Sequence, residues 1–155
     1  MTNWILRAIL VASLAVACGD GPTTPTDPLS QASFTVDGQT YTGSPKGMSA
    51  LDRGAGTTDI ATDNCRGTSI ILSVQAPLAI GPHPLNRVNQ AALFQSGTQW
   101  DWQRSAPGSL TFTSVSPRLV GQYSFEMRPL QNPTGPSRVV QGSFDVSYGN
   151  GTVCQ

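Results

Sequence analysis

The heptapeptide QYSFEMR, residues 122–128, decides the fold class because its polar and apolar side chains alternate strictly. Successive side chains of a strand point to opposite faces of a sheet, so Tyr123, Phe125 and Met127 fall together on one face. The stretch GSFDVSY, residues 142–148, alternates in the same way. Each stretch therefore predicts a strand with one buried and one solvated face, as in an antiparallel sheet.

The chain before these two stretches shows the same signal in shorter segments. Asp37-Gly38 favours a type I′ hairpin turn, because both central residues of that turn need positive φ, and Ser96-Gly97 is the expected turn of a second hairpin. Helical periodicity is almost absent. We therefore predict an all-β fold of about eight or nine strands, either a single antiparallel sandwich or an up-and-down barrel. The other strands are expected at residues 33–36, 40–42, 70–74, 91–95, 98–104, 110–115 and 119–128.

Three segments rich in loop-forming residues separate the predicted strands. Residues 78–89 and 129–136 are expected loops because they carry prolines, which cannot donate to a strand ladder. Residues 53–64 are expected to form a longer loop because they are rich in Gly, Thr and Asp. Binding functions commonly lie in such long loops.

The N-terminal segment has the pattern of an export signal. One fixed positive charge precedes the apolar run Ala8 to Ala17, which is too short to span a bilayer. The run ends at Leu14-Ala15-Val16-Ala17-Cys18-Gly19, which resembles the lipobox of bacterial lipoproteins. The resemblance implies that Cys18 receives a diacylglycerol thioether, that residues 1–17 are removed and that Cys18 becomes the mature N-terminus. Ordinary secretion and an uncleaved anchor stay as alternatives.

A spacer and one domain are expected after the lipidated cysteine. Residues 19–31 contain three prolines and show no apolar periodicity, which predicts a disordered tether over 18–31. Residues 32–155 then form a single β-rich domain of 124 residues. The expected location is the bacterial cell envelope, anchored through lipid on Cys18. Gly19, rather than an aspartate, follows the cysteine, which favours the outer membrane if the host has one.

The charge of the domain argues against nucleic acid as a partner. Removing residues 1–17 takes Arg7 from the nine basic residues, which leaves eight against nine acidic ones. The chain has a single lysine, Lys46, and its arginines are scattered. A nucleic-acid interface would need Lys and Arg clustered on one face.

Two cysteines remain once Cys18 is assigned to lipid. Cys65 and Cys154 form an even pair in a domain expected to be exported, where disulfides persist. Neither has a CxxC partner or a nearby histidine, so a disulfide is favoured over a metal or catalytic pair. A bridge that closes the loop from Cys65 to Cys154 is expected to stabilise the fold by about 4 to 5 kcal/mol on a chain-entropy estimate.

Residues that could support catalysis are few. His83 is the only histidine and lies between two prolines, Glu126 is the only glutamate, and no G-x-S-x-G motif is present. A hydrolase needs a base beside its nucleophile, or two carboxylates at a defined separation. We therefore predict no catalytic residue, no metal and no cofactor.

Two groups of residues are candidates for binding. Trp100 and Trp102 share a strand face, which would form a stacking platform for sugars or other flat ligands if exposed, or would fill the core if buried. The segment Asp52 to Asn64 offers oxygen ligands for calcium, including Asp59 and Asp63. The same residue types also cap turns, so both interpretations stay open.

Several short motifs occur in a fixed order along the domain: FTVDG at 34–38 with Tyr41, the strand at 70–74, Gly81 to Leu85, Gly108 to Phe112, Gly121 to Phe125 and Gly142-Ser143-Phe144. Their order resembles an uncharacterised family of bacterial lipoprotein domains. The resemblance implies a β-rich exported domain and supplies no established active site.

The leading expectation is a non-enzymatic envelope lipoprotein that binds an envelope protein, a glycan or a small ligand. A structural or assembly component of the envelope is the alternative, and a hydrolase acting on cell-wall or carbohydrate material comes third.

Overall fold

The computed structural model describes residues 30–44, 48–52, 54, 56–149 and 154. The expected signal peptide, the lipidation site Cys18 and the tether up to Leu29 lie outside these described residues. Within them the fold is all-β, as predicted, and its strand pairs are antiparallel apart from one isolated parallel bridge. No helix in the described part of the chain is long and apolar enough to cross a membrane.

The strands follow one another through short turns, with one 3-10 turn before the seventh. They are β1 (Gln31–Val36), β2 (Gln39–Thr42), β3 (Met48–Asp52), β4 (Thr57–Asp63), β5 (Thr68–Gln75), β6 (Gly81–Pro82), η1 (Leu85–Arg87), β7 (Val88–Gln95), β8 (Thr98–Trp102), β9 (Gly108–Ser114), β10 (Arg118–Pro129) and β11 (Arg138–Ser147). The main path through the sheet is β2-β1-β11-β10-β8-β7-β5-β4-β3, with β9 and β6 beside β10. Chain order is broken where β1 pairs with β11 and β8 with β10.

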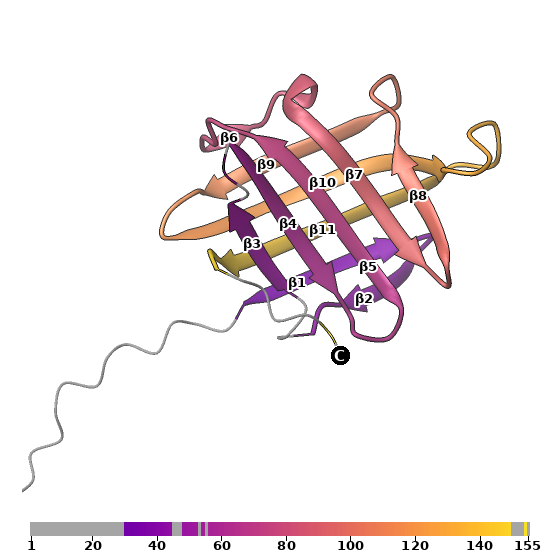
Figure 1. The fold of residues 1–155 in the computed structure, drawn as a ribbon, viewed down its shortest axis with the longest axis horizontal. Coiled ribbons are helices and arrows are strands. Elements are labelled where there is room, and N and C mark those ends of the chain that lie inside the picture. Colours follow the sequence, from indigo (N-terminus) through magenta and orange to yellow (C-terminus); the bar gives the residue numbers. More distant parts are fainter. Residues whose placement is uncertain (1–29, 45–47, 53, 55, 150–153, 155) are drawn as a thin grey trace, which may run out of the picture.

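Two long strands, β10 and β11, join the layers of the fold. One edge of β10 pairs with β11, and the opposite edge pairs first with β9 and then, from Met127 to Pro129, with β8. The edge of β11 that does not face β10 pairs with β1. Tyr148, just beyond the end of β11, bridges to Ala50 of β3. The sheet therefore curls into a half-barrel whose two layers cross at a steep angle, with β3, β4, β5, β7 and β8 in front of β1, β2, β9, β10 and β11 (Figure 1).

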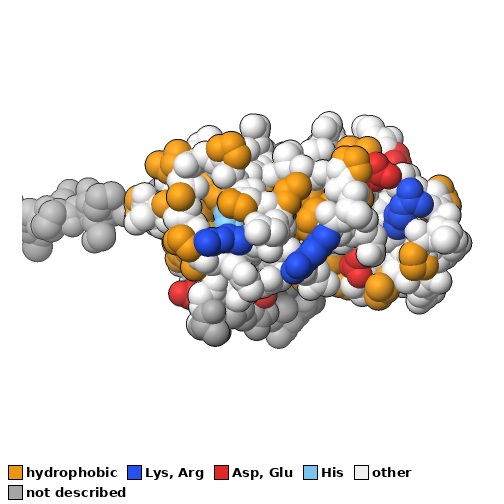
Figure 2. Space-filling view, turned by 90° about the horizontal axis from the view of Figure 1, so that it is seen from above, with side chains coloured by type: hydrophobic (Ala, Val, Ile, Leu, Met, Phe, Trp, Pro, Cys, Tyr) orange, Lys and Arg blue, Asp and Glu red, His pale blue; other side chains and the backbone are white. Residues whose placement is uncertain are grey.

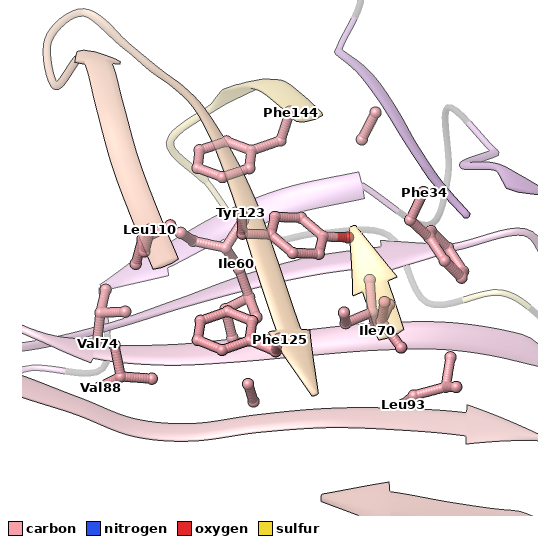
Figure 3. Packing of buried hydrophobic residues seen from close by; sticks show 14 of the residues in the cluster. Phe34, Ile60, Ile70, Val74, Val88, Leu93, Leu110, Tyr123, Phe125 and Phe144 are labelled. Atoms are coloured by element: carbon pink, nitrogen blue, oxygen red, sulfur yellow. The ribbon is translucent and has the colours of Figure 1, made fainter. Parts of the chain in front are cut away.

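The space between the layers is filled with hydrophobic side chains. Tyr123, Phe125 and Met127 of β10 are all buried, as their alternation predicts. Phe125 packs against Trp102 of the other layer with ring centroids 5.2 Å apart. Figure 3 shows Phe125 among side chains of both layers. The other labelled core residues are Phe34, Ile60, Ile70, Val74, Val88, Leu93, Leu110, Tyr123 and Phe144.

One end of the two layers is fastened by a network around Arg138 of β11. Its Nε lies 3.2 Å from Asp37 Oδ2 in the β1–β2 turn, and its Nη1 donates to Gln95 Oε1 at 2.6 Å. Its guanidinium carbon lies 4.2 Å from the centroid of the Trp100 ring. Gln95 Nε2 in turn donates to the Tyr41 hydroxyl at 2.6 Å. The network joins the β1–β2 hairpin to the β7–β8 hairpin.

Both predicted hairpin turns are confirmed. Asp37 and Gly38 have φ of 50° and 82°, and Ser96 and Gly97 have φ of 50° and 79°. These are the positive values that a type I′ turn requires at both central positions. They fix the register of β1 with β2 and of β7 with β8.

The expected loop over residues 53–64 is wrong, because β4 occupies most of it. β4 pairs with β3 on one side and β5 on the other. Its inward side chains are Thr58, Ile60 and Thr62, and all three are buried. Two buried threonines hide the alternation of polarity by which a half-buried strand is recognised. The expected loop over 78–89 is also shortened, by β6, η1 and the start of β7.

Candidate functional site

The tryptophan pair does not form a stacking platform. Trp100 and Trp102 are 9% and 6% exposed and belong to the core. Trp102 Nε1 donates to the Ala106 carbonyl at 3.1 Å. β8 lies between β7 and β10, and its alternation turns Gln99 and Asp101 outward instead. Of the two open interpretations of this pair, the exposed binding face is therefore wrong and the core position is confirmed.

The predicted disulfide between Cys65 and Cys154 is present, with Cα atoms 5.2 Å apart. It ties the β4–β5 turn to the C-terminal end of the chain. Asp63 lies beside the two sulfurs, and its Oδ1 accepts the Cys65 N–H at 2.7 Å. Metals bind the thiolate form of cysteine, so the oxidised pair acts here as a covalent link beside a capped turn.

The side chains considered for calcium cap turns at the two ends of β4. Asp52 Oδ1 accepts the Gly54 N–H at 2.8 Å, and Asn64 Oδ1 accepts the Arg66 N–H at 2.8 Å. Asp59 lies in the middle of the strand, opposite Ser73 of β5. The oxygens are thus spread along an extended segment, and turn capping accounts for the contacts of Asp52 and Asn64.

His83 and Glu126 lie in surroundings without a catalytic partner among the described residues. The His83 side chain is 5% exposed, packs edge-on against Phe112 with ring centroids 5.5 Å apart, and its Nε2 has no hydrogen-bond partner within the described part of the chain. Figure 2 shows the histidine beside hydrophobic side chains and a basic side chain. Burial lowers its pKa, a hydrogen bond with the Arg87 backbone opposes this in part, and the Arg87 charge adds a smaller lowering effect. Glu126 Oε1 lies 3.6 Å from Arg128 Nη2, as an ion pair on the outer surface.

The central part of the outer surface of the β2-β1-β11-β10-β9 layer is made of uncharged hydrogen-bonding side chains. Register places them in two rows that cross the strands: Thr42, Ser33, Ser143, Gln122 and Thr111 in one, and Thr40, Thr35, Gln141, Ser124 and Ser109 in the other. We call these ten residues the polar face. Eight of them line a shallow hollow of about 490 Å³, together with Phe34, Tyr123 and Gly142.

The polar groups of this face are available to a ligand. Thr35 Oγ1 donates to the Gln141 carbonyl at 3.4 Å. Within the described part of the chain, the other nine side chains make no hydrogen bond to the protein. Hydroxyls and amides both donate and accept, so the face offers both kinds of group.

Charged side chains border the polar face at both ends and are already paired. At one end Arg118 Nε lies 2.5 Å from Asp145 Oδ1, and Arg118 Nη1 donates to Ser147 Oγ at 2.6 Å. At the other end Glu126 and Arg128 form the pair described above. The face is therefore electrically neutral and has no unpaired cation or anion beside it among the described residues of β10 and β11.

The outer surface of the opposite layer has a different composition, and we call it the mixed face. It has half-buried apolar groups beside acidic ones, and Ala92 is fully buried there although it points away from the core cluster. Its members, taken in register, are Leu51, Asp59, Ala61, Asp63, Ser69, Ile71, Ser73, Gln90, Ala92, Phe94, Gln99 and Asp101.

A second hollow of about 720 Å³ lies where β1 starts and β2 ends. It is lined mainly by apolar or small residues, among them Ala32, Gly43, Met48, Gly121 and Phe144. Gly43 lies tightly against Met48, since a Cβ at that glycine would come within 2.7 Å of the methionine side chain.

The individual residues of the polar face are predictable as outward positions of strands, but the face itself is not. Its rows depend on the pairing of β1 with β11, which are separated by about a hundred residues in sequence and cannot be aligned by local pattern. Comparison with known protein families finds no matching family, and comparison with curated proteins finds no match.

Proposed function

We propose that this protein is a lipid-anchored bacterial envelope lipoprotein whose β domain is a non-enzymatic binding module, with the polar face as its binding surface. The observation that carries the proposal is the polar face, because its donors and acceptors lie free over a filled core. A surface that only kept the domain soluble would gain more from charged side chains of both signs.

The lipid anchor is supported by the lipobox-like residues 14–19 and by the disulfide. Cys65–Cys154 suits an oxidising compartment outside the cytoplasm. In this proposal Cys18 is held at the outer membrane of a host with two membranes. The resemblance to a lipoprotein domain family points in the same direction.

A structural or assembly role in the envelope is the second candidate. The burial of Trp100 and Trp102 favours it, because these rings stabilise the scaffold instead of contacting a ligand. A hydrolase is the weakest candidate, since the described contacts of His83 and Glu126 include no second catalytic group.

Site-specific photo-crosslinking in living cells tests the proposal. A photoreactive residue replacing Ser143, in the middle of the polar face, is expected to capture an envelope molecule. The matched control replaces Ser73 on the mixed face and is expected to capture none. Equal capture at both positions, or none at Ser143, would overturn the binding role of this face. Palmitate labelling that persists in Cys18→Ala would overturn the anchor.

A further inference from the structure

We infer that the ligand of the polar face is an uncharged glycan chain that lies across the strands. This inference rests on the proposed binding role and adds the chemical class of the ligand. It follows from three properties of the face: its charge, its spacing and its lack of large apolar groups.

The lack of formal charge on the polar face favours a neutral ligand. The ten side chains carry no formal charge, and the charged groups of β10 and β11 that border them, Arg118 with Asp145 and Arg128 with Glu126, already neutralise one another. A polyanion such as nucleic acid or an acidic polysaccharide would need unpaired cations to replace its counterions. A neutral polyhydroxyl chain needs only donors and acceptors.

Spacing selects an extended ligand with repeated polar groups. Neighbouring strands lie about 4.8 Å apart, so the row Ser33, Ser143, Gln122 and Thr111 presents a polar side chain at that interval across four strands. The parallel row through Gln141 lies two residues along the strands, about 7 Å away. Each strand thus contributes one polar group to each row, and a chain crossing the strands meets them in regular succession.

The outward positions of the face carry no large apolar side chain, because Phe34 and Tyr123 at its hollow are buried, and this argues against lipids and hydrophobic segments of proteins as ligands. The strongly exposed hydrophobic residues lie elsewhere: Ile80 and Leu130 in loops, Val139 beyond the second row and Tyr148 after β11. Hydroxyl and amide groups instead match the hydroxyls of a sugar, which also donate and accept.

The experiment measures binding of the full chain in detergent to maltohexaose, cellohexaose and mannohexaose, with hexagalacturonate as the charged comparator. At least one neutral probe is expected to bind more tightly than hexagalacturonate. Gln122→Ala is expected to weaken that binding about three- to tenfold, the worth of one hydrogen bond. Gln90→Ala on the mixed face removes the same exposed amide from the other layer and is expected to leave binding unchanged. Unchanged melting temperatures of both variants show that the fold is intact.

Three outcomes overturn the inference, and they differ in what they mean for the proposed function. Equal losses for Gln122→Ala and Gln90→Ala would place the glycan site elsewhere. Preference for hexagalacturonate would contradict the neutral ligand. If no neutral probe binds and a protein is captured at Ser143 in cells, the inference of a glycan ligand is wrong, whereas the proposed binding role of the polar face stands.

Discussion

The polar face and the mixed face cover the same core from opposite sides, yet they use their outward positions differently. On the mixed face Ile71 and Phe94 are half-buried, and Ala92 is shielded completely by its neighbours. On the polar face Ser143 and Gln122 stand free. Packing in the core therefore constrains only the inward-facing side chains of each strand. The outward half is free to vary, and on one layer it forms a uniform surface of hydroxyls and amides.

The polar-face layer and the mixed-face layer are expected to share one core and to unfold together. Phe125 of the polar-face layer packs on Trp102 of the other layer, so Phe125→Ala is expected to lower the free energy of unfolding by about 3–5 kcal/mol. Urea unfolding followed by tryptophan fluorescence and by far-UV circular dichroism should give one coincident transition. Two separate transitions would show that the layers unfold independently.

The disulfide ties the β4–β5 turn of the mixed-face layer to the chain beyond β11, so its removal tests how far the fold depends on this link. The double substitution Cys65→Ser and Cys154→Ser is expected to lower the free energy of unfolding by about 2–5 kcal/mol, with the chain-entropy estimate at the upper end, because the unfolded chain regains the freedom of a long loop. Calorimetry measures this cost. Binding at the polar face, assayed below the lowered melting temperature, should not change. Loss of binding in the folded variant would contradict the independence of the two surfaces.

His83 lies where the β5–β7 connection of one layer covers Phe112 of the other. Its titration makes the stability of this contact between the layers depend on pH. Burial lowers its pKa below 6.5 in the folded state. The unfolded chain then takes up the proton first as the pH falls, so stability present above pH 6.5 is lost as the pH falls below it.

We expect this loss to be smaller than that of either substitution above and to show as a lower melting temperature at about pH 5.5 than at about 7.5. His83→Gln should reduce the difference. A variant with the same pH dependence as the natural chain would assign the effect to other groups.

The smallest expected effects come from exchanging outward side chains. Ile71→Ser on the mixed face should cost about 1 kcal/mol, because part of an apolar side chain leaves its neighbours. Gln122→Ser on the polar face should change stability by less than about 0.5 kcal/mol. Chemical denaturation of both variants measures the difference, and equal costs would remove the distinction between the faces.

Prediction from sequence succeeded where a strand follows simple alternation and failed where chemistry or distance hides the pattern. The strands around Phe125 and Ile70 and both hairpins were predictable, since each depends on neighbours in the chain. β4 was missed because Thr58 and Thr62 are buried polar residues. The polar face was missed because it depends on register between distant strands. The position of Trp100 and Trp102 stayed open because local sequence does not tell which side of β8 faces the core.

The position of β1 has a mechanical consequence. The described chain begins at Ser30, whose Oγ accepts the Ser147 N–H at 3.2 Å, and it enters at once a strand held by β2 on one edge and β11 on the other. A pull on this end along the strand loads all of these backbone hydrogen bonds together in shear, whereas a pull across the strand would open them one by one. The N-terminal end of the described domain thus resists extension through many backbone hydrogen bonds at once.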